Sequence, residues 1–374
     1  MRTPICDLLG IDFPLLAFSH CRDVVAAVTN AGGFGVLGAT TYSPAQLEQE
    51  LGWLDEHVAG RPYGIDILVP QRLVGKGENL THADLLARVP DSHRAFVRDL
   101  LAQHDLDIAA FADEFLAMDT QFEFGEQLLE VAFRHPIKLI ASALGIAPDY
   151  MLERGKAEGV PVAALVGARE HAIKQVHAGV DIIVAQGTEA GGHCGDVATM
   201  VLVPEVIEAI RPIRDVPVLA AGGIVTGRQV AAAVALGAAG AWTGSVWLTT
   251  EEAETAPVTV QKMLAATARD AVRSRGRTGK PARQLRSAWT EAWDGPSSPG
   301  PLPMPLQSLL SGRLLRRVDT LAERGHAGAR DLATYFVGQG VGLLAKSSRA
   351  GDVVREMIED YLDAVERMTA SLEG

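Results

Sequence analysis

The stretch VPVLAAGGIVTGRQVAAAVALGAAGAWTGSVW, residues 216–247, contains two apolar runs separated by one helical pattern. The runs 216–223 and 239–245 predict buried strands, whereas residues 226–237 carry apolar residues at helical spacing and end at a glycine. A strand, a helix and a second strand within about 30 residues form a βαβ unit. Such a unit places its two strands parallel in one sheet.

The same alternation extends back to the start of the chain. Six further apolar runs predict strands, most of them followed by a helical pattern: 14–19, 34–38, 63–69, 137–143, 160–166 and 181–187. Their continuous apolar character indicates burial on both faces of a parallel sheet. An open doubly wound sheet and a closed barrel both fit this pattern, but eight units within about 250 residues favour the barrel. We therefore predict an α/β fold, a (β/α)8 TIM barrel over residues 1–250.

Two regions fall outside the eight units. Residues 71–134 predict a helical insertion between the third and fourth strands, and residues 251–374 a C-terminal helical extension that packs on the barrel. The extension begins with a helical pattern at 259–272 and passes through a Pro/Gly/Ser-rich connector at 294–307. It ends in an amphipathic helix at 352–368, which suits either self-association in a homo-oligomer or packing on the barrel.

Composition restricts the partners and the compartment. The formal net charge of −12 argues against nucleic acid or an anionic membrane as the main partner. Asp7 and Asp12 interrupt the N-terminal apolar residues, so no signal peptide is predicted, and the longest apolar stretch, 230–242, is too short to span a bilayer. Three cysteines without a C-x-x-C pair fit a reducing compartment. We expect a cytoplasmic protein that acts on a small molecule.

Three loops that follow predicted strands are unusually rich in glycine. They contain Gly191-Gly192-His193, Gly222-Gly223 and Gly244-Ser245. Each glycine alone could mark a tight turn or a packing position. At two neighbouring strand ends, however, paired glycines expose backbone N–H groups, a following helix adds partial positive charge, and barrels commonly bind phosphate there. The third loop lies opposite, which suggests a ligand with a phosphate at one end and a planar ring at the other, and FMN fits this description.

His193 is the candidate catalytic residue. A lone histidine is more often a structural hydrogen-bonding group, but this one is flanked by glycines in a strand-end loop, where core packing does not require an imidazole. Its near-neutral pKa suits proton transfer beside a redox ring. We therefore predict that His193 is catalytic.

Two further patterns carry weaker predictions. His20-Cys21 and His193-Cys194 could supply zinc ligands, but adjacent residues rarely face one ion, and we predict no metal. The basic stretch 269–286 is either a solvated helix and turn or an anchor for a phosphorylated cosubstrate such as NAD(P)H or a CoA thioester.

The segment QGTEAGGHCG, residues 186–195, resembles the Q-G-x-E-A-G-G-H-x-G pattern of the nitronate monooxygenase family, also called 2-nitropropane dioxygenase-like flavoproteins. AAGGI at 220–224 and GSVWL at 244–248 are similar to the phosphate-binding segments of that family, and TGKPAR at 278–283 is a weaker match. The resemblance implies a TIM barrel with non-covalent FMN and His193 as catalytic base. It further implies flavin contacts from Gln186, Gly191 and Gly192 and phosphate contacts from Ala221, Gly222, Gly223, Gly244 and Ser245.

Two predicted flavin-binding positions depart from the family pattern. Ala17-Phe18-Ser19 stands where the family usually has A-P-M, and Asp66 stands where it usually has an asparagine that faces the flavin. A carboxylate accepts hydrogen bonds but donates none unless it is protonated. Asp66 is therefore expected to interact with the pyrimidine edge of the flavin differently from an amide.

The resemblance implies an FMN-dependent oxidoreductase, a monooxygenase in which a carbanion such as an alkyl nitronate reduces the flavin and O2 reoxidises it. The alternative is a reductase that uses the same site in reverse: NAD(P)H reduces FMN, which then passes hydride to an enone or an unsaturated acyl-CoA thioester. A third hypothesis is a flavin-binding or scaffold protein without catalysis. The length of the insertion and the arginines of 269–286 favour a bulky, phosphorylated substrate, whereas the histidine loop is common to both reactions.

Overall fold

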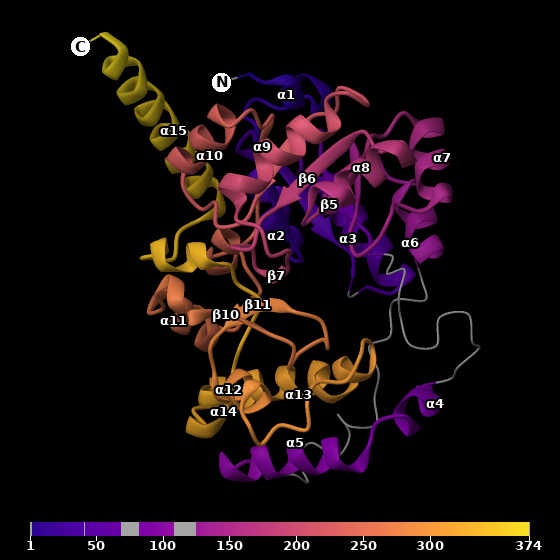
Figure 1. Ribbon diagram of the computed structural model, residues 1–374, viewed down its shortest axis with the longest axis vertical. Helices are drawn as coiled ribbons and strands as arrows, with labels where there is room; N and C mark the ends of the chain where they lie inside the picture. Colours follow the sequence, from indigo (N-terminus) through magenta and orange to yellow (C-terminus); the bar gives the residue numbers. More distant parts are fainter. Residues whose placement is uncertain (1, 41, 69–81, 108–124, 374) are drawn as a thin grey trace.

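The computed structural model describes residues 2–40, 42–68, 82–107 and 125–373. Eight parallel strands close into a barrel, which confirms the predicted (β/α)8 fold (Figure 1). In order around the barrel they are β1 (Leu15–Ser19), β2 (Phe34–Gly38), β3 (Gly64–Asp66), β4 (Leu139–Ser142), β5 (Val162–Val166), β6 (Ile182–Gln186), β8 (Val218–Ala221) and β9 (Gly240–Thr243).

The barrel strands are buried on both faces, as their continuous apolar runs predicted. Alternate side chains such as Leu16, Phe34 and Leu219 fill the inside of the barrel. The side chains between them, such as Ile65 and Ile183, pack against the surrounding helices in a larger outer cluster. Each strand lies within its predicted run, and the residues that follow it turn into the loops at the carboxyl end of the barrel.

The helices that alternate with the strands form the outer layer. They are α2 (Arg22–Asn30), α3 (Pro44–His57), α6 (Gly125–Ala132), α7 (Asp149–Glu158), α8 (Arg169–Ala178), α9 (Thr199–Ile210) and α10 (Gly227–Ala235), and the short α1 (Pro4–Leu9) precedes the first strand. Local sequence explains where they begin: at α3, for example, Ser43 and Gln46 form a capping box and Pro44 opens the first turn.

The last helix of the chain completes this layer. α15 (Ala350–Glu373) packs between α10 and α2, beside the strand pair that closes the barrel, and extends past the barrel at its far end (Figure 1). Gly227 permits close contact, because a Cβ atom there would overlap the carbonyl oxygen of Met357. Asp360 accepts hydrogen bonds from the Arg228 side chain and backbone N–H. The sequence left two roles open for this helix, self-association and packing on the barrel. In the structure it packs on the barrel.

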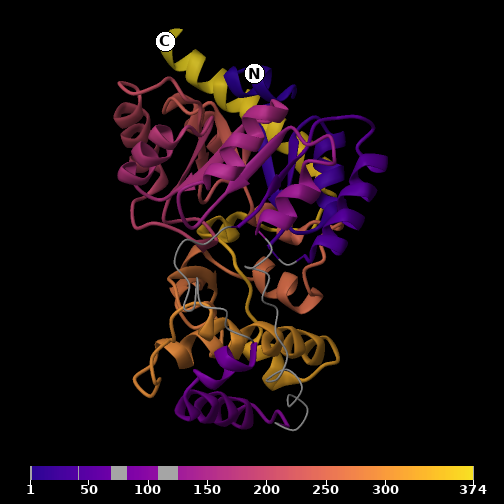
Figure 2. The same ribbon diagram turned by 90° about the vertical axis from the view of Figure 1, so that its right-hand side faces the viewer.

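A second group of helices, which we call the cap, lies beyond the end of the barrel where β7 (Gly192–His193) sits (Figures 1 and 2). Its members are α4 (His82–Ala87), α5 (Asp91–Gln103), α11 (Pro257–Leu264), α12 (Ala288–Asp294), α13 (Leu306–Glu323) and α14 (Ala327–Leu332). Leu101 of the inserted segment, Trp289 and Leu315 share one hydrophobic cluster. Two segments distant in the sequence therefore fold together as one layer.

In its described residues the predicted insertion 71–134 contains the helices α4, α5 and α6, and residues 69–81 and 108–124 lie outside the described part of the chain. Its last helix, α6, packs against α3 and belongs to the barrel layer, not to the cap. In the described part of the chain, no helix is long and apolar enough to cross a membrane.

A small antiparallel sheet lies between the barrel and the cap. β11 (Ala282–Leu285) pairs on one side with β10 (Ala271–Ser274) and on the other with β7. The predictions of a helix over 259–272 and of a helix and turn over 269–286 were therefore wrong beyond the end of α11. β11 is paired on both sides and all of its residues are buried, so tertiary contacts override the helical pattern of this segment.

Candidate functional site

Inward-facing side chains line the barrel where the strands end. Phe18 and Trp242 belong to the cluster that fills the barrel, and their rings stack with centroids 6.3 Å apart. Asp66 is in register with the inward-facing Ala141, so its side chain points to the same side. Gln186 continues the inward-facing alternation of β6. The structure therefore brings Phe18, Asp66 and Gln186 to one end of the barrel.

The two neighbours of Phe18 are placed differently. Ala17 packs in the outer cluster between strands and helices, so its side chain points away from the barrel axis. The Ser19 hydroxyl accepts a hydrogen bond of 3.1 Å from the backbone N–H of Cys21 and shapes the turn after β1. Within 17–19, Phe18 is the residue whose side chain reaches the barrel mouth.

Asp66 is a buried carboxyl group with an unsatisfied oxygen. It is 7% exposed, and its Oδ1 has no hydrogen-bond partner among the described residues. Burial raises the pKa of Asp66 to about 7. Because buried polar atoms are nearly always hydrogen-bonded in native proteins, an orphaned oxygen inside the barrel mouth fits a ligand that carries polar groups.

The glycine turns after β8 and β9 lie side by side, since Ala221 pairs with Trp242. Gly222 and Gly223 have φ angles of 111° and 71°, which glycine adopts without strain. In the described loops, the N–H groups of Gly222, Gly223 and Gly244 donate to no protein oxygen. A Cβ atom on Gly244 would meet nothing within 4 Å. Unpaired donors around an open space fit a phosphate group.

Two residues that sequence reasoning missed hold the first of these turns. The Thr199 hydroxyl lies 3.2 Å from the carbonyl oxygens of both Ala221 and Gly222. The Glu189 carboxylate accepts hydrogen bonds from the Thr199 hydroxyl and backbone N–H. An acidic residue three positions after Gln186 and a threonine at a helix start are the signals that could have indicated them.

The helix after this turn contributes less than expected. At the start of α10, Thr226 and Gln229 form a capping box, and the N–H of Arg228 donates to Asp360 at 2.7 Å. The N–H of Arg228 in the first turn of this helix is thus engaged by a carboxylate, whose negative charge opposes anion binding there. The candidate phosphate donors are the glycine N–H groups and Ser245, not the end of α10.

A segment of the C-terminal extension packs against the same turns. The N–H of Gly338 donates to the Ser245 hydroxyl oxygen at 2.8 Å, and the N–H of Gln339 to the Glu189 carbonyl at 2.8 Å. A Cβ atom on Gly191 would lie 2.8 Å from the Gly338 nitrogen. The alternating glycines of VGQGVG, residues 337–342, were the sequence signal for this contact.

His193 is held at the edge of the small sheet. It pairs with Ala282, and its Nδ1 lies 3.2 Å from the carbonyl oxygen of Pro281. Because a carbonyl only accepts, Nδ1 carries the proton and Nε2 keeps a free lone pair. Burial lowers the pKa of His193, and the nearby Lys280 lowers it further, although the Pro281 contact opposes both. The imidazole is therefore neutral at neutral pH and able to accept a proton.

The basic stretch 269–286 is largely engaged within the protein. Arg273 forms an ion pair with Asp196, and Arg283 donates to the carbonyl oxygens of Thr188 and Ala271. Arg277 lies over the rings of Tyr335 and Phe336.

The two His-Cys pairs do not come together around an ion. Cys21 donates to the Glu252 carbonyl at 3.0 Å, and Cys194 to that of Thr188 at 3.5 Å. In the described ranges, no three His, Cys, Asp or Glu side chains cluster as metal ligands would.

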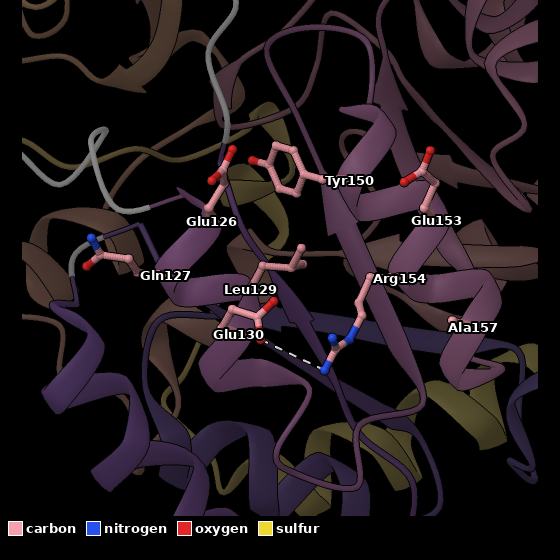
Figure 3. Close-up of a pocket in the computed structure, with 8 residues that line it drawn as sticks. All are labelled: Glu126, Gln127, Leu129, Glu130, Tyr150, Glu153, Arg154 and Ala157. Atoms are coloured by element: carbon pink, nitrogen blue, oxygen red, sulfur yellow. Dashed lines mark ion pairs between the residues drawn. The ribbon is translucent and has the colours of Figure 1, made fainter.

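A hollow of about 550 Å³ lies on the outer layer between α6 and α7 (Figure 3). Glu130 and Arg154 form an ion pair across it at 3.9 Å. It contains none of the predicted site residues; its lining consists of Glu126, Gln127, Leu129, Glu130, Tyr150, Glu153, Arg154 and Ala157.

Comparison with known proteins identifies the family of the chain. Residues 3–360 match the family described as nitronate monooxygenase. The chain is 54% identical over 369 residues to "Putative monooxygenase Rv1533" of Mycobacterium tuberculosis, with 98% of each chain covered. It is 30% identical to a "Probable nitronate monooxygenase" of Staphylococcus saprophyticus, over 77% of this chain and 79% of that one. A solved nitroalkane oxidase from Streptomyces ansochromogenes is similar in fold, with a TM-score of 0.77, 24% identity and coverage of 97% and 99%. The chain belongs to the nitronate monooxygenase family and is an oxidoreductase of this type.

Proposed function

We propose that this protein is an FMN-dependent oxidoreductase that oxidises a carbanion-type substrate, such as an alkyl nitronate, with O2. The observation that carries the proposal is the pair of adjoining glycine turns whose N–H groups are unpaired, with His193 on the loop of the neighbouring strand. Family membership supports the flavin and the reaction class.

The phosphate group of FMN would be held by Gly222, Gly223, Gly244 and Ser245. Their backbone donors are already oriented by the strand ends, so an anion gains hydrogen bonds there without reorganising the protein. Phe18 and Trp242 form an apolar surface at the mouth of the barrel, which would exclude water beneath a planar ring. When bound, FMN supplies an acceptor for the electron pair of a carbanion and a route for those electrons to O2.

His193 is the group that moves the proton. Its free Nε2 would take a proton from the carbon beside an electron-withdrawing group, while the Pro281 carbonyl fixes the tautomer and stabilises the imidazolium that forms. With a substrate that is already an anion, the same residue would stabilise the negative charge only when Nε2 is protonated.

Anaerobic stopped-flow absorbance tests the proposal. The yellow protein is mixed separately with propyl-2-nitronate and with NADH, and the flavin band is followed. Prompt bleaching by the nitronate, with none by NADH, is the expected result. Bleaching by NADH alone would instead assign the NAD(P)H-dependent reductase of enones or acyl-CoA thioesters. Bound flavin that neither compound bleaches would assign a flavin-binding protein without this catalysis, and a chain that takes up no FMN would overturn the proposal.

A further inference from the structure

Asp66 lies across the barrel from the glycine turns. In the closed strand order, three strands separate β3 from β8 in either direction. This inference rests on the proposed function: a flavin whose phosphate is held after β8 and β9 can reach Asp66 only if its ring system extends across the barrel mouth. Asp66 points into that mouth in register with Ala141.

The unsatisfied oxygen of Asp66 indicates which edge of the flavin ring lies beside this carboxyl group. One edge of the flavin carries methyl groups, and the other, the pyrimidine edge, carries an N–H group and two carbonyl oxygens. A buried carboxyl beside methyl groups would stay unsatisfied, which is unfavourable. Beside the pyrimidine edge its buried Oδ1 gains a partner.

No described neighbour of Asp66 stabilises a negative charge. The paired residues Gly38 and Ala141 on the adjoining strands do not titrate. The titratable group nearest to Gly38 is His20, whose Nδ1 lies 2.9 Å from the Gly38 carbonyl oxygen. Burial lowers the pKa of His20, so this imidazole is neutral. Burial also raises the pKa of Asp66 to about 7, with no opposing charge in the described structure.

We propose that Asp66 binds the pyrimidine edge of FMN as a neutral carboxylic acid, donating one hydrogen bond and accepting one, so that cofactor retention depends on pH. The acid O–H donates to a flavin carbonyl oxygen, and its C=O accepts from the ring N–H. The ionised form has acceptors only and would face a carbonyl oxygen with a negative charge. An asparagine offers the same donor and acceptor pair as the neutral acid but does not titrate.

The test is the Kd of FMN for apoprotein, measured by quenching of flavin fluorescence from pH 6 to pH 9. For the wild type, Kd should rise above neutral pH and approach a tenfold increase, or about 1.4 kcal/mol, per pH unit. For Asp66→Asn, Kd should be nearly constant between pH 7 and pH 9, because the FMN phosphate, whose second pKa is about 6, is already ionised there. The wild type and the variant share that phosphate, so their difference isolates the carboxyl group.

Each other outcome has a defined meaning. Equal pH slopes for wild type and Asp66→Asn would overturn the inference, and so would a variant that binds weakly at every pH, since Asp66 would then act as an anion. If neither protein binds FMN, the proposed function fails instead. Circular dichroism checks folding. Should Asp66→Asn misfold, Asp66→Ser supplies a smaller donor and acceptor that does not titrate. The pH slopes of Kd for the wild type and Asp66→Ser are then compared in the same way.

Discussion

His193 combines three properties that a proton-transfer residue needs. Its tautomer is set by the Pro281 carbonyl, its pKa is lowered chiefly by burial, and it lies on a loop at the carboxyl end of the barrel. Gly192 before it has a φ of 73°, a conformation that favours glycine. The backbone of β7, paired with β11, thereby fixes the position of the imidazole.

Replacement of His193 by alanine is expected to leave FMN bound and to lower turnover of a neutral nitroalkane about 10²- to 10⁴-fold, the usual contribution of a positioned base. Turnover of the preformed nitronate should fall less, because its proton is already gone. Steady-state kinetics with both substrates measures the difference, and His171→Ala, an exposed site on α8, is the control. Unchanged turnover of the nitroalkane would remove His193 from the mechanism.

The acid limb of the pH profile should also belong to His193. A base works when it is unprotonated, and burial lowers the pKa of His193 from its usual 6.5, so kcat/KM for a neutral nitroalkane should fall on the acid side with a midpoint below pH 6.5. The profile is best recorded in the Asp66→Asn background, where the carboxyl does not titrate. The limb should be absent from the residual activity of His193→Ala; its persistence would assign it to another group.

At the scale of the element, the two strand-end turns have different tolerances. A Cβ atom on Gly222 would lie 2.7 Å from the hydroxyl of Thr199, the residue that contacts the carbonyl oxygens of this turn. Gly244 has an ordinary φ of −134° and open space at its Cβ position. A side chain at 244 would therefore enter the proposed phosphate position without disturbing the backbone.

Gly244→Asp should fold normally and lose FMN affinity by about 100-fold or more, because a carboxylate would face the phosphate. Gly244→Asn is the matched control, equal in size and uncharged, and should bind distinctly better. The ratio of flavin absorbance to protein absorbance after gel filtration, followed by titration with FMN, measures the difference. Equal affinities for the two variants would place the phosphate elsewhere.

At the scale of the whole molecule, the end of the chain completes the barrel layer. α15 packs between α10 and α2, and the segment around Gly338 packs on the turns at the carboxyl end of the barrel. The stability of the barrel and the shape of its mouth thus both depend on residues more than 80 positions beyond the last barrel strand.

Gly227→Ala should destabilise the whole chain by about 1–3 kcal/mol, because the added methyl would overlap the Met357 carbonyl and separate α15 from α10. Gly312→Ala is the matched control: it lies within α13, a Cβ atom there meets nothing within 4 Å, and it should stabilise by up to about 1 kcal/mol. Thermal unfolding of both variants gives the comparison. A Gly227→Ala protein as stable as Gly312→Ala would contradict the packing of α15.

Local sequence was sufficient for the strands, most of the helices and the glycine turns. An apolar run such as 181–187 predicts a strand, and a glycine such as Gly237 predicts the end of a helix. Both patterns depend only on a few neighbouring residues, so they can be recognised from the sequence alone. Burial of both strand faces fits an open sheet as well as a barrel, and it was the number of units, eight within about 250 residues, that favoured the barrel. The candidate histidine was recognisable in the same way, from the glycines around it.

Contacts between distant segments required the folded chain. The pairing of β11 with β7, the place of α15 in the outer layer, and the approach of Gly338 to Ser245 join residues about 90 or more positions apart. The unsatisfied oxygen of Asp66 is likewise invisible along the sequence. Periodicity indicates which face of a helix or strand is buried but not which other element covers that face. Closure of the barrel determines the covering element, because it brings the carboxyl ends of the strands next to the C-terminal extension.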